Sequence, residues 1–333
     1  MKRIVLLLFA SLSFGVANAQ GDLDQLLKGS QADANYLAQG YLEPVLNAIG
    51  SGLNQGWYNT AANHKKFGFD LTLSVSSIQF PSEDSYYKVD NSKLQTIRVV
   101  SPADGNVPTL VGPKTAPTYE YMANGVPTGS TFQGPEGTDL KNEIPLGGLP
   151  VPTLNLGIGL LWNTDLKLRY GSANPSGGTK INLFGFAIQH DIKQHIPGLK
   201  ELPFDLSALF GYTTFNTEVA FDPTNNPSQI GKSDFTATTI QALVGKKFSV
   251  LSLYGSIGYN FSSGTFKALG TYDTGAPPPA NPQMTDPVSI SSSVNGPRAT
   301  VGARLKLAVF TLHGDYTFQR YNTITLGFGI SVR

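Results

Sequence analysis

The feature that most constrains the fold is a two-residue alternation near the C-terminal end. In residues 324–332, Ile, Leu, Phe, Ile and Val occupy the even positions, and Thr, Gly, Gly and Ser occupy the odd positions between them. Successive side chains of a strand point to opposite faces, so this segment has one apolar face and one polar, glycine-containing face. An apolar outside with a polar inside is typical of a membrane-spanning barrel, whereas a soluble antiparallel barrel would invert the two faces.

A closed barrel is also favoured by what the rest of the chain lacks. After residue 16, no apolar run reaches the length of about 20 residues that a spanning helix needs. The 36 glycines, 22 prolines and only 14% charged residues favour strands joined by turns over helices. A chain that crosses a bilayer with strands must close them into a barrel, because lipid cannot satisfy unpaired backbone groups.

The alternation predicts an all-β, antiparallel transmembrane outer-membrane β-barrel of 10–12 strands, with up to 14 possible. Residues 94–100 are a candidate for an extra strand, which would raise the count from ten to twelve. Long loops are expected at 81–151 and 263–296, on the side opposite the short turns. The ten segments that share the pattern are 66–80, 154–160, 166–170, 180–192, 204–216, 235–248, 250–262, 299–309, 312–318 and 324–332.

The N-terminal residues predict export. Two basic residues precede an apolar run at 4–16, and Ala17 and Ala19 then supply the small-x-small pattern of a signal-peptidase site. Residues 1–19 are therefore predicted to be a cleaved signal peptide, with Gln20 as the first mature residue. The expected destination is the outer membrane of a gram-negative bacterium, reached through the periplasm.

Residues 20–63 lack the strand pattern and predict a helical, plug-like segment ahead of the barrel at 64–333. Ser30 followed by Asp33 indicates a helix start, and Gly50 and Gly52 indicate its end. The alternatives are a periplasmic helix against the barrel rim or a flexible tail, because a ten-strand barrel leaves little room for a helix. The candidate plug residues are Leu37, Tyr41, Val45, Ile49 and Trp57.

The inferred inner face carries charges of both signs. They favour either a lining that selects solutes or a set of cross-strand pairs that hold the lumen shut. No serine can be assigned to a histidine–aspartate pair from spacing, so we expect no enzymatic activity and no catalytic residues. With 0 cysteines and no metal or nucleotide motif, we expect no metal and no cofactor. The candidate lumen-lining residues are Asp70, Lys167, Arg169, Asp205, Arg304, Lys306, His313 and Asp315.

Two stretches carry a resemblance to known barrels. Residues 21–70 begin GDLDQLLKGSQADANYLAQGYLEPVLNAIG, and residues 190–212 read HDIKQHIPGLKELPFDLSALFGY. Together with the ending DYTFQRYNTITLGFGISVR, they resemble an uncharacterised family of bacterial outer-membrane β-barrel proteins. The helix before the first strand gives a weaker similarity to the long-chain fatty acid outer-membrane transporter family. That second resemblance implies a hatch and fourteen strands, and Arg333 departs from the terminal aromatic residue common in bacterial barrels.

The functional prediction is passive uptake of a small solute, hydrophobic solutes included, by a monomer embedded in outer-membrane lipid. The alternative is a non-transporting surface barrel whose extracellular loops bind a partner. Nucleic acid is not expected as a partner, because 24 basic residues nearly balance 23 acidic residues.

Overall fold

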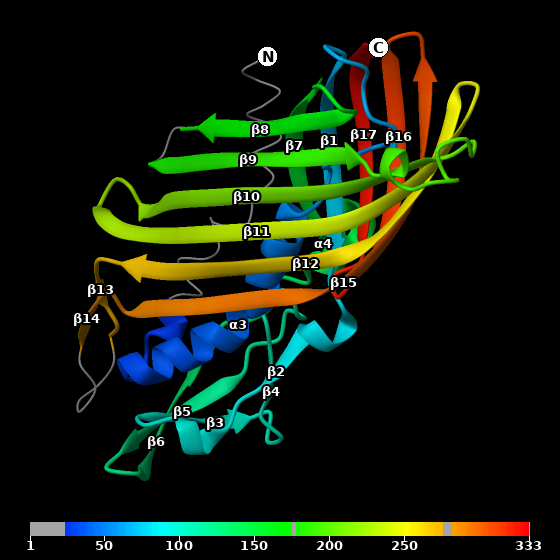
Figure 1. Cartoon of the computed structure of the whole chain (residues 1–333). Coiled ribbons are helices and arrows are strands. Elements are labelled where there is room, and N and C mark those ends of the chain that lie inside the picture. Colours follow the sequence, from blue (N-terminus) through cyan, green and yellow to red (C-terminus); the bar gives the residue numbers. More distant parts are fainter. Residues whose placement is uncertain (1–23, 175–177, 276–281, 333) are drawn as a thin grey trace.

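Ten strands close into one antiparallel barrel, in which β1 pairs with both β7 and β17 (Figure 1). This computed structural model describes residues 24–174, 178–275 and 282–332. The predicted signal peptide, with Ala17, Ala19 and Gln20, lies outside the described residues. The barrel strands are β1 Phe69–Gln79, β7 Gly148–Gly159, β8 Thr164–Ala173, β9 Thr179–Asp191, β10 Asp205–Asp222, β11 Asn226–Phe248, β12 Leu251–Leu269, β15 Val288–Leu307, β16 Phe310–Phe318 and β17 Thr323–Val332.

The barrel confirms the ten strands predicted from the alternation and the direction of their faces. In β17, Leu326 and Phe328 are 55% and 53% exposed, whereas Thr325 and Ser331 point inward and are 1% and 2% exposed. Strand β9, apolar on both faces in the sequence, turns its phenylalanines outward and its smaller side chains toward the lumen. Within the described residues, no helix is long and apolar enough to cross a membrane.

The connections differ in length between the two ends of the barrel. Four connections, 160–163, 192–204, 249–250 and 308–309, lie at the end where β1 begins and β17 finishes. We call this the turn end. The other five connections lie at the opposite end and include the long segment between β1 and β7. We call it the outer end, because bacterial barrels carry their longer loops outside the cell.

One side of the wall is much taller than the other. Strands β10, β11, β12 and β15 have 18, 23, 19 and 20 residues, whereas β16 and β17 have 9 and 10. Figure 1 shows these tall strands running well past the outer end of β1. We call the parts of these strands nearest the outer end the outer extension. It comprises residues 214–222, 226–238, 262–269 and 288–296. The loop expected at 263–296 is accordingly shorter, since both strands continue into it and leave only 270–287.

The segment between β1 and β7, residues 80–147, folds into what we call the outer domain. The candidate extra strand at 94–100 exists as β3 Ile97–Ser101, but it pairs with β5 outside the barrel, so it does not raise the count of barrel strands from ten to twelve. Residues 270–287 carry a short hairpin of β13 Thr271–Asp273 and β14 Gln283–Thr285. The remaining elements of the outer domain are β2 Tyr86–Lys88, β4 Asn106–Pro108, β5 Thr118–Ala123, β6 Val126–Gln133, α4 Leu140–Glu143 and the 3-10 turns Ser82–Ser85, Asn91–Lys93 and Pro145–Gly147.

Helix α3, Gln31–Leu53, lies inside the outer extension and packs against β12 and β15 (Figure 1). Its start was predicted correctly: Ser30 and Asp33 form a capping box. The predicted end was wrong, because Gly50 and Gly52 lie within the helix. A Cβ at Gly52 would come 2.6 Å from Val151 Cγ2, so this glycine allows the helix to approach the wall closely rather than ending the helix.

The main apolar core lies in the outer extension, between α3, the tall strands and the outer domain. Leu37 and Tyr41 of the helix join Phe235 and Ile290 of the wall and Tyr119 of the outer domain in one cluster, and all five side chains are at most 5% exposed. At about 25 cal/mol for each Å² of apolar surface buried, this cluster holds the outer domain on the barrel. Both Val45 and Ile49 are partly buried farther along the helix.

Candidate functional site

The candidate site is the lumen, because the segment after α3 runs through it from the outer end to the turn end. Trp57, Tyr58 and Ala61 pack against Leu209 and Leu243 of the wall. The wall also binds the backbone of this segment. Side-chain donors on β9 and β10 bond to its carbonyl oxygens: Gln189 Nε2 donates at 3.3 and 3.2 Å to Thr60 and Ala61, and Ser207 Oγ at 2.5 Å to Ala61.

Two buried arginines on opposite sides of the barrel hold the end of the helix. Arg169 of β8 donates from Nη1 to the Leu53 carbonyl at 2.8 Å and from Nη2 to the Gln55 carbonyl at 2.7 Å. Arg298 of β15 donates from Nη1 to the Asn54 carbonyl at 3.1 Å and from Nη2 to Gln55 Oε1 at 2.9 Å. The last carbonyls of a helix lack partners and carry partial negative charge, so cations suit this position. We call the pair the arginine clamp.

The clamp has further support from the wall and the segment. The Arg169 guanidinium lies 3.7 Å from the centre of the Trp57 ring, and its Nε donates to Asn155 Oδ1 at 3.0 Å. Both Arg169 and Trp57 are 1% exposed. A desolvated cation–π contact contributes about 2 kcal/mol, and hydrogen bonds to a charged group about 1.5–3 kcal/mol each. The threaded segment is therefore firmly attached at this level.

A second cluster holds the segment at the turn end. His64 Nδ1 lies 2.9 Å from Asp165 Oδ2, and its Nε2 lies 3.4 Å from Ser331 Oγ and 3.6 Å from Asp70 Oδ1. Serine, histidine and carboxylate stand here in the order of a nucleophilic triad. However, Ser331 is 2% exposed and already accepts a hydrogen bond from Lys306 Nζ at 3.1 Å. The cluster thus ties the segment to β1, β8 and β17, and the absence of enzymatic activity stays a prediction.

The predicted lumen residues all lie on the inward side of the wall, at different depths. Asp70, Lys167, Arg169, Arg304 and His313 are buried, at 1–8% exposure. Asp205, Lys306 and Asp315 are partly exposed, and Asp315 accepts a hydrogen bond from Tyr254 at 3.0 Å. Among the described residues, no ion pair joins a basic member of this set to an acidic member. Within the set, Arg169 bonds to the threaded segment and Asp70 lies close to His64 of that segment.

Sequence reasoning missed several residues of the site. Arg298 has the same strand parity as Arg304, but the segment considered began one residue later, at 299. Extending the alternation upstream would have placed it on the inner face. His64 is a second missed residue, since no sequence pattern marked it and it is only 9% exposed. No pattern in residues 54–64 marks the backbone carbonyls that the clamp binds.

The outer domain is tied to α3 through the buried carboxylate of Asp33. It accepts hydrogen bonds from the backbone N–H groups of Gln95 and Thr96 at 2.7 and 2.9 Å. Farther out, Arg98 Nη2 donates to Glu120 Oε2 at 2.6 Å, and this contact lowers the pKa of Glu120 below its usual range. The outer domain is thus a folded unit with its own sheet and ion pair.

An antiparallel closed barrel with an apolar outer surface and a polar lumen is the fold of an outer-membrane β-barrel protein. Residues 1–332 match the family of unknown function DUF6588, and the chain belongs to that family. This confirms the resemblance to a barrel family without an established activity. No curated protein matches the sequence.

Three solved structures illustrate how distant the structural relatives are. OmpT, the outer-membrane protease of Escherichia coli, is 11% identical, with 80% of this chain and 96% of that chain covered and a TM-score of 0.32. Ail, the attachment invasion locus protein of Yersinia pestis, is 8% identical, with 80% and 99% covered and a TM-score of 0.28. A Pseudomonas aeruginosa FadL homologue is 13% identical, with 87% and 68% covered and a TM-score of 0.29. Likenesses this distant carry no argument about activity.

Proposed function

We propose that this protein is a sealed outer-membrane barrel that holds a folded outer domain at the cell surface for interaction with a partner. The observation that carries the proposal is the arginine clamp, in which Arg169 and Arg298 bind the segment that fills the lumen. A freely conducting pore needs an open lumen, whereas a display scaffold needs a rigid one. The clamp supports the second.

The outer domain supports the same reading. It has a defined surface, unlike an irregular loop, because β3, β5 and β6 form a sheet and Asp33 connects it to α3. The apolar core between α3 and the tall strands fixes this surface relative to the membrane. Folded surface loops on a rigid scaffold are the usual place for binding residues.

Passive uptake of a small solute remains the second candidate, and a specific observation favours it. Beside the apolar contacts of Trp57, Tyr58 and Ala61, much of the interface between the threaded segment and the wall is polar, unlike a permanent core. Within the described residues, Thr153 Oγ1, Gln189 Oε1, Arg304 Nη2 and His313 Nδ1 are buried without a hydrogen-bond partner. A polar interface separates at lower cost than an apolar one, so a ligand that pulls on the outer domain could withdraw the segment.

The proposal includes the location and the partners of the barrel in the cell. Export would follow cleavage after Ala19, and the mature monomer would sit in outer-membrane lipid with its turn end in the periplasm. The exposed apolar residues of the wall, such as Ile257 at 69% exposure, support contact with acyl chains. Hydrolysis is not part of the proposal.

Conductance in planar bilayers tests the sealed lumen. We expect the purified wild-type protein to give no single-channel steps, and the Arg169→Ala/Arg298→Ala double variant to give them. The matched control is Arg98→Ala, which removes an arginine of the outer domain and should leave the bilayer silent. Regular wild-type steps would overturn the sealed barrel and favour uptake. Silence of a correctly folded double variant would show that the clamp does not hold the lumen shut.

A further inference from the structure

The apolar surface of the barrel ends partway along the tall strands. The last apolar row that crosses them in register joins Phe210, Ile240, Tyr259 and Pro297. Three of these side chains are 39–53% exposed on the outside. Aromatic residues at such a border mark the level of lipid headgroups in membrane barrels. Residues beyond this row, toward the outer end, therefore face the headgroup region.

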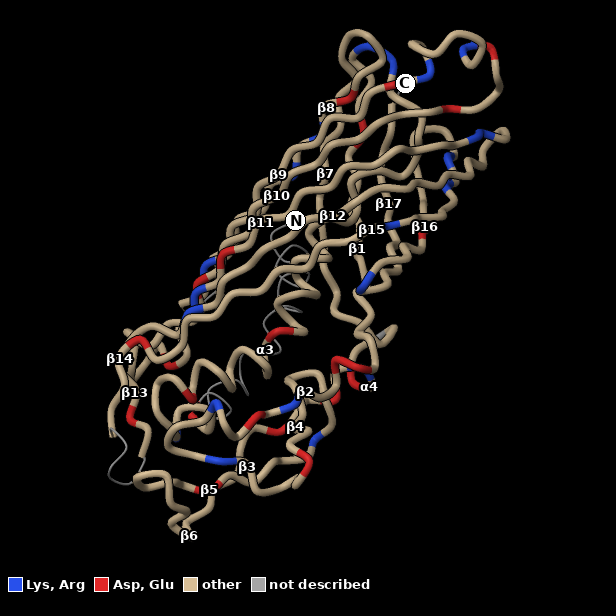
Figure 2. Tube along the Cα trace, turned by 60° about the horizontal axis from the view of Figure 1, so that its bottom comes forward, with Lys and Arg blue, Asp and Glu red and all other residues tan. Residues whose placement is uncertain are grey.

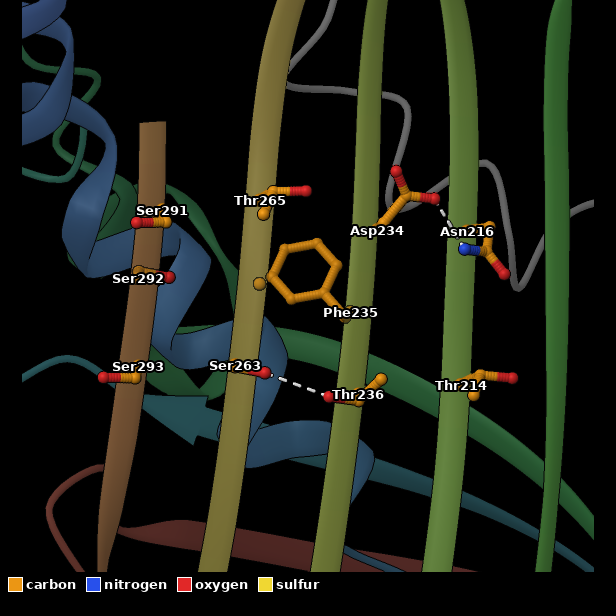
Figure 3. Close-up of a pocket in the computed structure, with 11 residues that line it drawn as sticks. Thr214, Asn216, Asp234, Phe235, Thr236, Ser263, Thr265, Ser291, Ser292 and Ser293 are labelled. Atoms are coloured by element: carbon orange, nitrogen blue, oxygen red, sulfur yellow. Dashed lines mark hydrogen bonds between the residues drawn. The ribbon is translucent and has the colours of Figure 1, made fainter. Parts of the chain in front are cut away.

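The next row toward the outer end is mixed and joins Tyr212, Thr238, Phe261 and Asn295, and two rows of short polar side chains follow it. One joins Thr214, Thr236, Ser263 and Ser293 across the four strands, and the next joins Asn216, Asp234, Thr265 and Ser291. They line a groove of about 580 Å³ on the outer face (Figure 3). Thr236 and Ser263 share a hydrogen bond at 3.0 Å, and Asn216 donates to Asp234 at 2.6 Å. The groove presents hydroxyl, amide and carboxylate groups, which suit the hydroxyls of a sugar.

A pair of lysines lies directly above the groove. Lys232 and Lys267 are register partners on β11 and β12, both on the outward face. Like charges directly opposite each other destabilise a sheet unless an anion compensates them. The acid beside them in register, Glu218, is bound by Lys180 at 3.1 Å, and neither Lys232 nor Lys267 forms an ion pair within the described residues. Figure 2 shows charged residues of both signs crossing the tall strands between the largely uncharged wall and the outer domain.

We propose that this face binds the phosphorylated sugar headgroup of an outer-leaflet glycolipid, that is, lipopolysaccharide. The acyl chains would lie on the apolar rows below, the sugar in the hydroxyl groove, and a phosphate between Lys232 and Lys267. The inference rests on the orientation given under the proposed function, with the tall strands outside the cell. It does not depend on whether the lumen is sealed.

Three features favour a glycolipid over a protein partner. The groove begins next to Phe261, which is 46% exposed in the mixed row, so a molecule with acyl chains and a polar headgroup can contact both the apolar surface and the groove. The lysine pair supplies positive charge at the height where a phosphate of such a headgroup would lie. The groove surface has short side chains and its aromatic ring, Phe235, is only 2% exposed, so it offers no apolar anchor for a protein hot spot.

The test measures binding of fluorescently labelled lipopolysaccharide to the purified full-length barrel in detergent micelles. We expect the Lys232→Glu/Lys267→Glu double variant to raise the Kd about tenfold or more, because charge-assisted contacts to phosphate are lost and repulsion replaces them. The matched control is Lys246→Glu, an exposed lysine of the same strand and the same face at the turn end. Its Kd should stay within about twofold of wild type, as a change far from the site requires.

Two further arms identify the ligand chemistry. Dephosphorylated lipopolysaccharide should bind more weakly and without dependence on the two lysines, and phosphatidylglycerol micelles should bind more weakly than lipopolysaccharide. Equal Kd values for the double variant and wild type would overturn the proposal. Equal binding of phosphatidylglycerol would overturn the sugar site, and a dimer that buries Ser263 would assign the face to a second copy. Conductance of the double variant is measured beside these arms and should match wild type, so failure of this site and failure of the sealed lumen are read separately.

Discussion

The lower barrel and the outer extension share the same strands but place their apolar residues on opposite faces. On β11, Ile240 points outward and is 53% exposed, while Gln241 points inward and is 3% exposed. Five residues earlier on the same strand, Phe235 points inward and is 2% exposed, while Thr236 points outward and is exposed. Strand parity is unbroken between the two regions, so only the chemistry of the faces has switched.

The switch shows what surrounds each region. The lower barrel has an apolar exterior because it faces acyl chains, and a polar interior because it encloses a polar segment. The outer extension has a polar exterior and an apolar interior, as in a soluble sheet that covers a helix. One wall therefore works as a membrane barrel along part of its height and as one layer of a water-soluble domain along the rest.

The N-terminal segment follows the same division. In the outer extension it is an α-helix with buried Leu37 and Tyr41 against an apolar wall. In the lower barrel it has no regular secondary structure, and its backbone is held by polar groups, above all Arg169 and Arg298. The helix ends at the level where the wall changes character, so the segment and the wall are matched along their length.

The largest expected effect comes from emptying the apolar interior of the outer extension. Phe235→Ala should lower the free energy of unfolding by about 3–5 kcal/mol, since it opens a cavity in a closed core. Ile240→Ala on the same strand should cost clearly less, because lipid or detergent fills the space left behind. Denaturant titration in detergent micelles gives both values. Equal costs would mean that the two regions do not differ as described.

Breaking the arginine clamp should have the next largest effect. Arg169→Ala should lower the free energy of unfolding by about 3 kcal/mol, because the buried carbonyls of Leu53 and Gln55 lose a charged donor. Arg98→Ala, at a partly exposed ion pair of the outer domain, should cost about 1 kcal/mol or less. The same titration measures both. If Arg169→Ala is as stable as Arg98→Ala, the clamp does not stabilise the folded protein.

A charge placed on the outward face sharpens the border between the regions. Ile257→Lys puts a cation among acyl chains and should cost about 2 kcal/mol or more of folding into lipid vesicles. Ser263→Lys, six residues along the same face of β12, should cost no more than about 0.5 kcal/mol, because it faces water and headgroups. If Ser263→Lys costs as much as Ile257→Lys, the acyl chains reach Ser263, and the membrane border lies nearer the outer end than described here.

The smallest expected effect is the pH dependence of the outer domain. The hydrogen bond from Arg98 keeps the pKa of Glu120 in the folded protein below its unfolded value. The stabilisation is therefore fully present above the unfolded pKa of about 4.3 and is lost as the pH falls through the folded pKa. Wild type should lose more stability between pH 6 and pH 3 than Glu120→Gln, as followed by the melting temperature. Parallel pH curves would show that the pair does not contribute.

The lower barrel was predictable from the sequence, and the outer extension was not. The ten strands were predictable because lipid imposes an apolar outward face on each of them, as at Leu326 and Phe328. The outer extension was read as loop because its outward face is Ser and Thr, as in Ser291 and Ser293, and lipid no longer sets the pattern. The two-residue alternation of the strand was enough to predict that Arg169 lies on the inner face. Its partners were not predictable, because they are backbone carbonyls of a segment without any periodic pattern.

A cross-link between the threaded segment and the wall tests most directly whether this segment closes the lumen. The chain has 0 native cysteines, so an engineered pair reports one contact only. A Cβ at Gly245 would lie 3.1 Å from Ala61 Cβ, near the separation of about 3.8 Å found in disulfides. We predict that Ala61→Cys/Gly245→Cys forms an intramolecular disulfide in intact cells, whereas Ala61→Cys/Ala268→Cys, with its second cysteine in the outer extension, does not. A folded barrel in which the first pair stays reduced under oxidant would contradict a lumen closed by its own N-terminal segment.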